Sequence, residues 1–203
     1  MKVKSFLPYG KPSISKEDIQ EVVAVLESDR ITRGPKVEEF EQAVATYCGA
    51  KYAVAFANGT SALMAAYHAA EVSSFDRVIT TPNTFVATVG AGMHYRSTPV
   101  FIDIDRDTGN LDLTQMELNV SYPSTRGRNV IVLVHFAGIP VDMQRLEHMV
   151  AEPDAILIED AAHALGSSYP SGEKVGSCAY SAMTTFSFHP VKNITTGEGG
   201  MVT

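Results

Sequence analysis

The stretch NVIVLVHF, residues 129–136, is typical of a β-strand buried on both faces, because its apolar residues do not alternate with polar ones. A strand of this kind lies inside a parallel sheet that helices cover on each side. Five further runs share the pattern: YAVAFA (52–57), RVITT (77–81), PVFIDI (99–104), AILIED (155–160) and AMTTFSF (182–188). The sequence therefore predicts six strands of one sheet, and GGMVT (199–203) indicates the beginning of another.

Segments with helical spacing separate the predicted strands. The first begins at Ser15, with Asp18 as a variant of the capping box, and Ile19, Val22 and Leu26 form one apolar face. Further helices are predicted near residues 37–47, 62–70, 86–95, 113–118 and 141–150. This alternation indicates an α/β fold, a three-layer sandwich with a mostly parallel central sheet.

Composition excludes several classes of protein. The 203 residues carry a net charge of -7, which argues against nucleic acid or an anionic membrane as the main partner. Cys48 and Cys178 form no CxxC or metal-ligand pattern, as is usual for a reduced cytosolic protein. The first residues, MKVKSFLPYGKP, lack the apolar core of a signal peptide, and no run is long enough to span a bilayer. We expect a soluble, cytoplasmic protein.

Polar clusters follow four of the predicted strands, at the carboxyl ends where ligands of a parallel sheet gather. Gly59, Thr60 and Ser61 begin a helix whose free amides, hydroxyls and dipole suit a phosphate, although a simple helix cap is the other interpretation. Phe85 follows the second strand. Its ring either stacks on a planar cofactor or packs the helix against the sheet, and the sequence leaves both choices open.

An acidic pair, Glu159 and Asp160, ends the fifth strand, where an unpaired buried carboxylate is costly. A carboxylate against a protonated ring nitrogen would be paired, and it would keep a pyridine cationic, as pyridoxal phosphate chemistry requires. The rival is a metal-dependent hydrolase in which His135, His163 and His189 converge with the pair. No HExxH-like spacing supports that alternative, so we expect no metal.

Residues 184–200, TTFSFHPVKNITTGEGG, carry one lysine beyond the sixth strand. Lys192 suits Schiff-base chemistry, in which a lowered pKa frees the amine to attack a carbonyl carbon, although a surface lysine on a loop is the alternative. Ser187 ends the strand and adds a hydroxyl to the predicted phosphate seat. No GxxxxGK[ST] motif is present, so the phosphate signal is not that of a nucleotide P-loop.

Four segments together resemble the DegT/DnrJ/EryC1/StrS family of sugar aminotransferases, which are pyridoxal-phosphate enzymes of fold type I. The segments are NGTSAL (58–63), TPNTFVAT (81–88), IEDAAHALGS (158–167) and FSFHPVKNITTGEGGMV (186–202). The last is most similar to bacterial enzymes that aminate C4 of UDP-4-keto-hexoses, such as those that make UDP-4-amino-4,6-dideoxy-N-acetyl-altrosamine. The resemblance implies transfer of an amino group from an amino acid, glutamate, to a nucleotide-linked deoxysugar in polysaccharide biosynthesis.

The resemblance also implies individual roles. Lys192 holds pyridoxal phosphate as a Schiff base and later moves a proton, Asp160 pairs with the pyridinium nitrogen, and Phe85 stacks on the ring. The other implied cofactor contacts are Gly59, Thr60, Ser61, His163 and Ser187. The implied substrate contacts are Thr32, Arg33, Gly34, His189 and Asn193.

Members of that family are nearly twice as long as this chain. They are dimers in which a C-terminal small domain and the neighbouring subunit complete the site. We therefore expect an N-terminal arm and helix over residues 1–35, a cofactor-binding large domain over residues 36–203 that is truncated before the small domain, and a homodimer. A non-catalytic fragment that binds the cofactor or a partner is the alternative.

Overall fold

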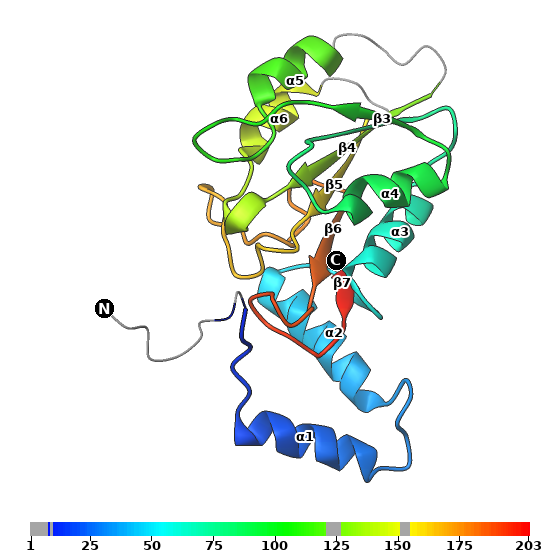
Figure 1. The fold of residues 1–203 in the computed structure, drawn as a ribbon, viewed down its shortest axis with the longest axis vertical. Helices are drawn as coiled ribbons and strands as arrows, with labels where there is room; N and C mark the ends of the chain where they lie inside the picture. The colour runs from blue at the N-terminus through cyan, green and yellow to red at the C-terminus, as the bar shows by residue number, and fades with distance from the viewer. Residues whose placement is uncertain (1–7, 9, 121–126, 151–154) are drawn as a thin grey trace.

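The computed structural model describes residues 8, 10–120, 127–150 and 155–203. Most of the extended arm expected over residues 1–12 lies outside the described residues. Within the described part, a seven-stranded sheet runs through the molecule, as Figure 1 shows. No helix in this part of the chain is long and apolar enough to cross a membrane.

The fold is α/β and its central sheet is mostly parallel, so the predicted fold class is confirmed. The strands are β1 (Val54–Phe56), β2 (Arg77–Thr80), β3 (Thr98–Phe101), β4 (Asn129–Val134), β5 (Ile156–Asp160), β6 (Met183–Ser187) and β7 (Gly200–Val202). They lie in the order β1-β7-β6-β5-β4-β2-β3. Strands β2 to β6 pair in parallel, whereas β7 runs antiparallel to both of its neighbours, β1 and β6. The strand expected at GGMVT therefore forms, and this chain pairs it on both sides.

Helices cover both faces of the sheet. They are α1 (Lys16–Leu26), α2 (Pro35–Cys48), α3 (Gly59–Ala69), α4 (Val86–His94), α5 (Leu113–Val120) and α6 (Met143–Met149), with a short 3-10 turn at Phe136–Gly138. Figure 1 shows α3 and α4 on one side of the sheet and α5 and α6 on the other. Helix α6 begins two residues later than predicted because the Asp142 side chain accepts a hydrogen bond from the Arg145 amide and caps it.

Two apolar clusters separated by the sheet form the core. Strand β4 contributes to both, since side chains of a strand alternate between faces. Val130 and Val132 pack with α3 and α4, while Ile131 and Leu133 pack in the cluster that contains residues of α2, α5 and α6. All four side chains are fully buried. This burial on both faces explains why residues 129–134 show no alternation of apolar and polar residues.

Helix α1 differs from the others because it buries none of its residues. The predicted capping box is present: the Ser15 hydroxyl accepts from the Asp18 amide at 3.1 Å, and the Asp18 carboxylate accepts from the Ser15 amide at 2.8 Å. The apolar face predicted for this helix remains exposed, with Val22 and Leu26 about 60% accessible. Figure 1 shows α1 at the foot of the molecule, with α2 between it and the sheet.

Candidate active site

A cavity of about 420 Å³ opens at the carboxyl ends of β1, β5 and β6. Seven of the residues predicted to form a site line it: Gly59, Thr60, Phe85, Asp160, Ser187, His189 and Lys192. A second cavity of about 340 Å³ shares Phe85, Asp160 and Lys192 with the first and adds His163. The two cavities therefore adjoin, and the three shared residues come from the ends of β2, β5 and β6.

The N-terminus of α3 supplies hydrogen-bond donors to this cavity. The amides of Gly59 and Thr60 begin the helix, so no preceding turn provides carbonyls for them. Asn58 caps the helix, and its Oδ1 accepts from both the amide (2.8 Å) and the hydroxyl (2.9 Å) of Ser61. The cap explains why α3 begins at Gly59, and it commits the Ser61 hydroxyl to Asn58. A methyl group at Gly59 would lie 3.0 Å from Ser187 Cβ, so the glycine lets Ser187 approach the helix end.

The Phe85 ring does not pack α4 against the sheet. Its side chain is 71% exposed at the lining of both cavities, whereas Ala87 and Ala91 of the same helix are buried in the core. An exposed aromatic face beside a cavity can cover a planar ligand. This exposure contradicts the packing interpretation of Phe85, while stacking on a planar cofactor stays a prediction.

Asp160 is the carboxylate of the cavity. It is only 5% exposed, and both of its oxygens accept hydrogen bonds. The Thr88 hydroxyl donates to Oδ2 at 2.6 Å, and the Ala162 amide donates to Oδ1 at 3.2 Å. A buried carboxylate held from two sides by neutral donors can pair with a cationic ligand group without reorganising.

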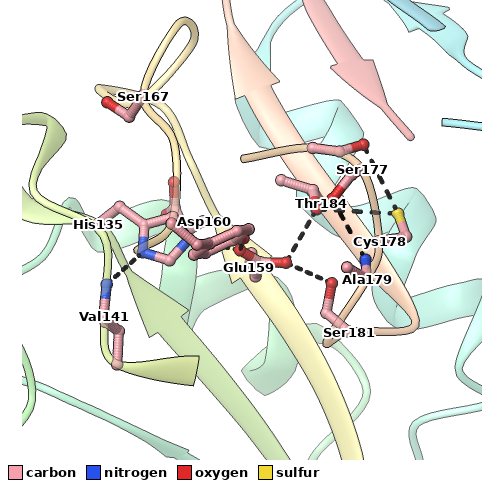
Figure 2. Close-up of polar contacts among 12 residues, drawn as sticks. His135, Val141, Glu159, Asp160, Ser167, Ser177, Cys178, Ala179, Ser181 and Thr184 are labelled. Atoms are coloured by element: carbon pink, nitrogen blue, oxygen red, sulfur yellow. Dashed lines mark hydrogen bonds and ion pairs between the residues drawn. The ribbon is translucent and has the colours of Figure 1, made fainter. Parts of the chain in front are cut away.

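Glu159 lies on the opposite face of β5 and has a structural role (Figure 2). Its carboxylate is fully buried and accepts four hydrogen bonds. Figure 2 shows Glu159 beside Ser181 and Thr184. The donors are the His135 Nε2–H (2.5 Å), the Thr184 hydroxyl (3.2 Å) and the hydroxyls of Tyr169 and Ser181. Because His135 Nδ1 accepts the Val141 amide at 3.1 Å, the ring proton resides on Nε2. Burial alone raises the pKa of Glu159, but the hydrogen bond and electrostatic attraction of His135, with the hydrogen bonds from Ser181 and Tyr169, outweigh burial and lower it.

Lys192 and His163 have shifted pKa values in the cavity. Burial lowers the pKa of Lys192, and the negative charge of Asp160 opposes only part of that effect. Burial also lowers the pKa of His163, and the positive charge of Lys192 lowers it further against the opposing influence of Asp160. Both shifts favour the neutral side chain, so the site holds an uncharged amine more readily than an ordinary lysine would.

The predicted substrate contacts are not all brought together. Thr32, Arg33 and Gly34 lie between α1 and α2, with Gly34 at the N-cap of α2, and none is among the described residues that line either cavity. The Asn193 side-chain amide donates to the Leu165 carbonyl at 3.1 Å, which ties the loop beyond Lys192 to the turn after β5. Of this set, His189 alone lines a described cavity.

The described residues contain no group of three His, Cys, Asp or Glu side chains arranged to hold a metal ion. His135 and Glu159 are instead bound to each other on the face of β5 away from Asp160.

Thr88 is the contact of the site that sequence reasoning missed. It lies four residues after Thr84 in TPNTFVAT; Thr84 precedes the N-cap of α4, and the two hydroxyls are 2.7 Å apart. Two threonines at this spacing, beside the apolar residues of α4, were the signal in the sequence that could have pointed to Thr88.

The side chains present fit pyridoxal phosphate. Helix amides and the Ser187 hydroxyl suit its phosphate, the Phe85 ring its planar face, Asp160 its ring nitrogen and Lys192 its aldehyde. The fold is that of the pyridoxal-phosphate-dependent aminotransferases of fold type I. The chain belongs to the DegT/DnrJ/EryC1/StrS aminotransferase family, whose model matches residues 12–203.

Several known proteins are similar over nearly the whole chain. The spore coat polysaccharide biosynthesis protein SpsC of Bacillus subtilis is 43% identical over 198 residues, which cover 98% of this chain and 49% of SpsC. A UDP-4-amino-4,6-dideoxy-N-acetyl-beta-L-altrosamine transaminase of Campylobacter jejuni is 41% identical over 196 residues, covering 97% and 50%. The PLP-form of a Streptococcus pneumoniae protein superimposes with a TM-score of 0.86 at 31% identity, covering 98% of this chain and 53% of that one. The chain thus spans about half the length of the curated relatives it matches.

Proposed function

We propose that this chain is the cofactor-binding half of a pyridoxal-phosphate-dependent sugar aminotransferase. The single observation that carries the proposal is the cavity at the strand ends, where a helix N-terminus, an exposed ring, a carboxylate and a lysine meet. When bound, pyridoxal phosphate supplies an electron sink and a carbonyl that can carry nitrogen.

The proposed roles of the chain's own residues follow from their contacts. The Gly59 and Thr60 amides and the Ser187 hydroxyl bind the phosphate, and Phe85 excludes water from one face of the ring. The Asp160 carboxylate, held by Thr88 and Ala162, holds a proton on the ring nitrogen. Lys192 Nζ anchors the cofactor and then takes and returns a proton at the substrate carbon that loses or gains nitrogen. The lowered pKa of Lys192 suits both tasks, because anchoring and taking the proton need a neutral amine, and the resulting ammonium returns the proton readily.

For the complete protein we propose transfer of an amino group from an amino acid, glutamate, to C4 of a nucleotide-linked deoxysugar. The support is the identity to the Campylobacter jejuni transaminase and to the Bacillus subtilis polysaccharide protein. We further propose that the protein works as a cytoplasmic homodimer, whose mass in solution light scattering measures directly.

The experiment that tests cofactor binding is absorption spectroscopy of the purified chain with pyridoxal phosphate, followed by borohydride reduction and peptide mapping. We expect a yellow species that reduction fixes on Lys192, and no fixed label in Lys192→Ala. Label on another lysine in the wild type, or none, would contradict the proposed anchor. Amination of UDP-4-keto sugars, with glutamate as donor, is then measured on the full-length protein, and activity in its Lys192→Ala variant would overturn the catalytic role.

A further inference from the structure

Thr88 lies at the centre of a buried chain of hydrogen bonds that ends on Asp160. Its side chain is fully buried, and its hydroxyl is 2.6 Å from Asp160 Oδ2 and 2.7 Å from the Thr84 hydroxyl. A carboxylate only accepts, so the one proton of Thr88 goes to Asp160, and Thr84 must donate to Thr88. The direction of both hydrogen bonds is therefore fixed toward the carboxylate.

The main chain of Thr88 is held as firmly as its side chain. Its carbonyl accepts the Tyr67 hydroxyl at 2.7 Å, and its amide donates to the Phe85 carbonyl at 3.0 Å. Tyr67 is fully buried in α3, the helix whose N-terminus lines the cavity. Thr88 thus joins α3, the first turn of α4 with its exposed ring, and the end of β5.

A buried threonine in a helix usually satisfies its hydroxyl on a carbonyl of its own preceding turn. Thr88 instead donates across to a strand 72 residues away in the sequence. The short Thr88 bond holds Asp160 Oδ2 and the longer Ala162 bond holds Oδ1. Each carboxylate oxygen can accept about two hydrogen bonds, so the carboxylate is fixed in rotation and still has capacity for a further donor.

We propose that Thr88 is a positioning residue that fixes the rotation of the Asp160 carboxylate and thereby directs one oxygen to the protonated ring nitrogen of the cofactor. This inference rests on the proposed function, since it needs pyridoxal phosphate in the cavity. Thr88 does not touch the cofactor and acts only through Asp160.

The test compares Thr88→Val, which removes the hydroxyl at constant shape, with Thr88→Ser, which keeps it. The matched control is Thr80→Val, because the Thr80 hydroxyl is fully buried and makes no hydrogen bond to any described residue. The readouts are the dissociation constant for pyridoxal phosphate, the visible absorption band of the bound form as a function of pH, and the melting temperature without cofactor.

We expect Thr88→Val to weaken cofactor binding by on the order of tenfold and to shift the pH dependence of the band, because a hydrogen bond to a charged group is lost. Thr88→Ser and Thr80→Val should bind within about threefold of wild type, within the range of ordinary substitutions. In an Asp160→Asn background, Thr88→Val should have little additional effect, since coupled residues are not additive.

Three outcomes overturn the inference alone: unchanged binding and spectrum in Thr88→Val, failure of Thr88→Ser to restore them, or full additivity with Asp160→Asn. A wild-type chain that does not bind pyridoxal phosphate overturns the proposed function, and this inference falls with it. Should Thr88→Val fail to fold, Thr84→Val removes the next donor in the chain and is expected to produce a smaller change in the same direction.

Discussion

At the residue scale, the reactivity of Lys192 follows from where its amine lies. Burial lowers its pKa, so at a given pH a larger fraction is neutral than for an ordinary lysine. Lys36 is a useful comparison within the same chain: hydrogen bonds from its exposed ammonium to Glu39 and Glu21 raise its pKa. The chain therefore contains two lysines shifted in opposite directions.

We predict that a small neutral acylating reagent modifies Lys192 faster than Lys36 at pH 8 without cofactor, because only neutral amines attack. Peptide mapping by mass spectrometry over time measures both rates in one sample. Asp160→Asn should accelerate the reaction at Lys192, since the carboxylate charge raises the pKa of that amine and its removal lowers it further. Faster modification of Lys36 would show that the Lys192 amine is not shifted as described.

The residue types of the acidic pair, Glu159 and Asp160, predict that both need partners but not which of the two faces the cavity. The sequence indicated that Glu159 and Asp160 end a strand and need partners, and both have them. Alternation along the strand places Asp160 in the cavity and Glu159 among His135 and Ser181, but which of the two faces the ligand depends on the neighbouring strands. Thr88 was missed for the same reason, because its partner lies far away in the sequence.

At the scale of elements, the start of α3 sets the shape of the cavity. The helix end, rather than any long side chain, offers the donors, so its approach to β6 matters. A Cβ at Gly59 would lie 3.0 Å from Ser187 Cβ and 3.3 Å from its Oγ, closer than ordinary contact. Gly90, in the exposed middle of α4, offers a contrast, since a Cβ there would meet nothing within 4 Å.

We predict that Gly59→Ala weakens binding of pyridoxal phosphate by on the order of tenfold, because Ser187 must move from the helix end, a loss comparable to one or two hydrogen bonds. Gly90→Ala should leave binding unchanged and stabilise the fold by about 0.5–1 kcal/mol, the usual gain from replacing glycine in a helix. Fluorescence titration and urea unfolding of both variants check this. Equal binding by the two would mean that the helix end does not contact the phosphate.

The elements themselves could be predicted well from the sequence. Each apolar run became a strand, although most strands are shorter than the runs, because hydrogen-bonded pairing ends before the apolar residues do. The place of β7 could not be predicted. Its three residues carry no periodic signal of which strands they join, and its position between β1 and β6 is set by pairing at long range.

At the scale of the whole molecule, the Glu159 network holds β4, β5 and β6 together with the connection between β5 and β6. The acceptor Glu159 is in β5, and its donors are His135 directly after β4, Thr184 in β6, and Tyr169 and Ser181 in the connection. The folded-state pKa of Glu159 is lowered. The ionised carboxylate therefore contributes stability that is fully present above the unfolded pKa of about 4.3, and this contribution is lost as the pH falls through the folded value.

We predict that Glu159→Gln lowers the free energy of unfolding at pH 7 by about 1–3 kcal/mol, because buried donors lose a charged acceptor. The difference from wild type should shrink below the unfolded pKa of about 4.3, because the unfolded chain then takes up a proton that the folded carboxylate resists. Urea unfolding between pH 3 and 7 measures it, with the exposed Glu147→Gln expected to stay within about 0.5 kcal/mol throughout. A difference that stays constant over this range would show that Glu159 is not ionised in the fold.

The position of β7 has a consequence for how the polypeptide assembles as it is synthesised. β1 is the first strand to be synthesised, yet its neighbour in the sheet is β7, with Val54 opposite Val202. β1 therefore cannot pair in the sheet until the last described strand has been translated. The parallel strands between them can pair earlier. The helix end that lines the cavity follows β1 directly, so a nascent chain completes its sheet centre first and its ligand pocket last.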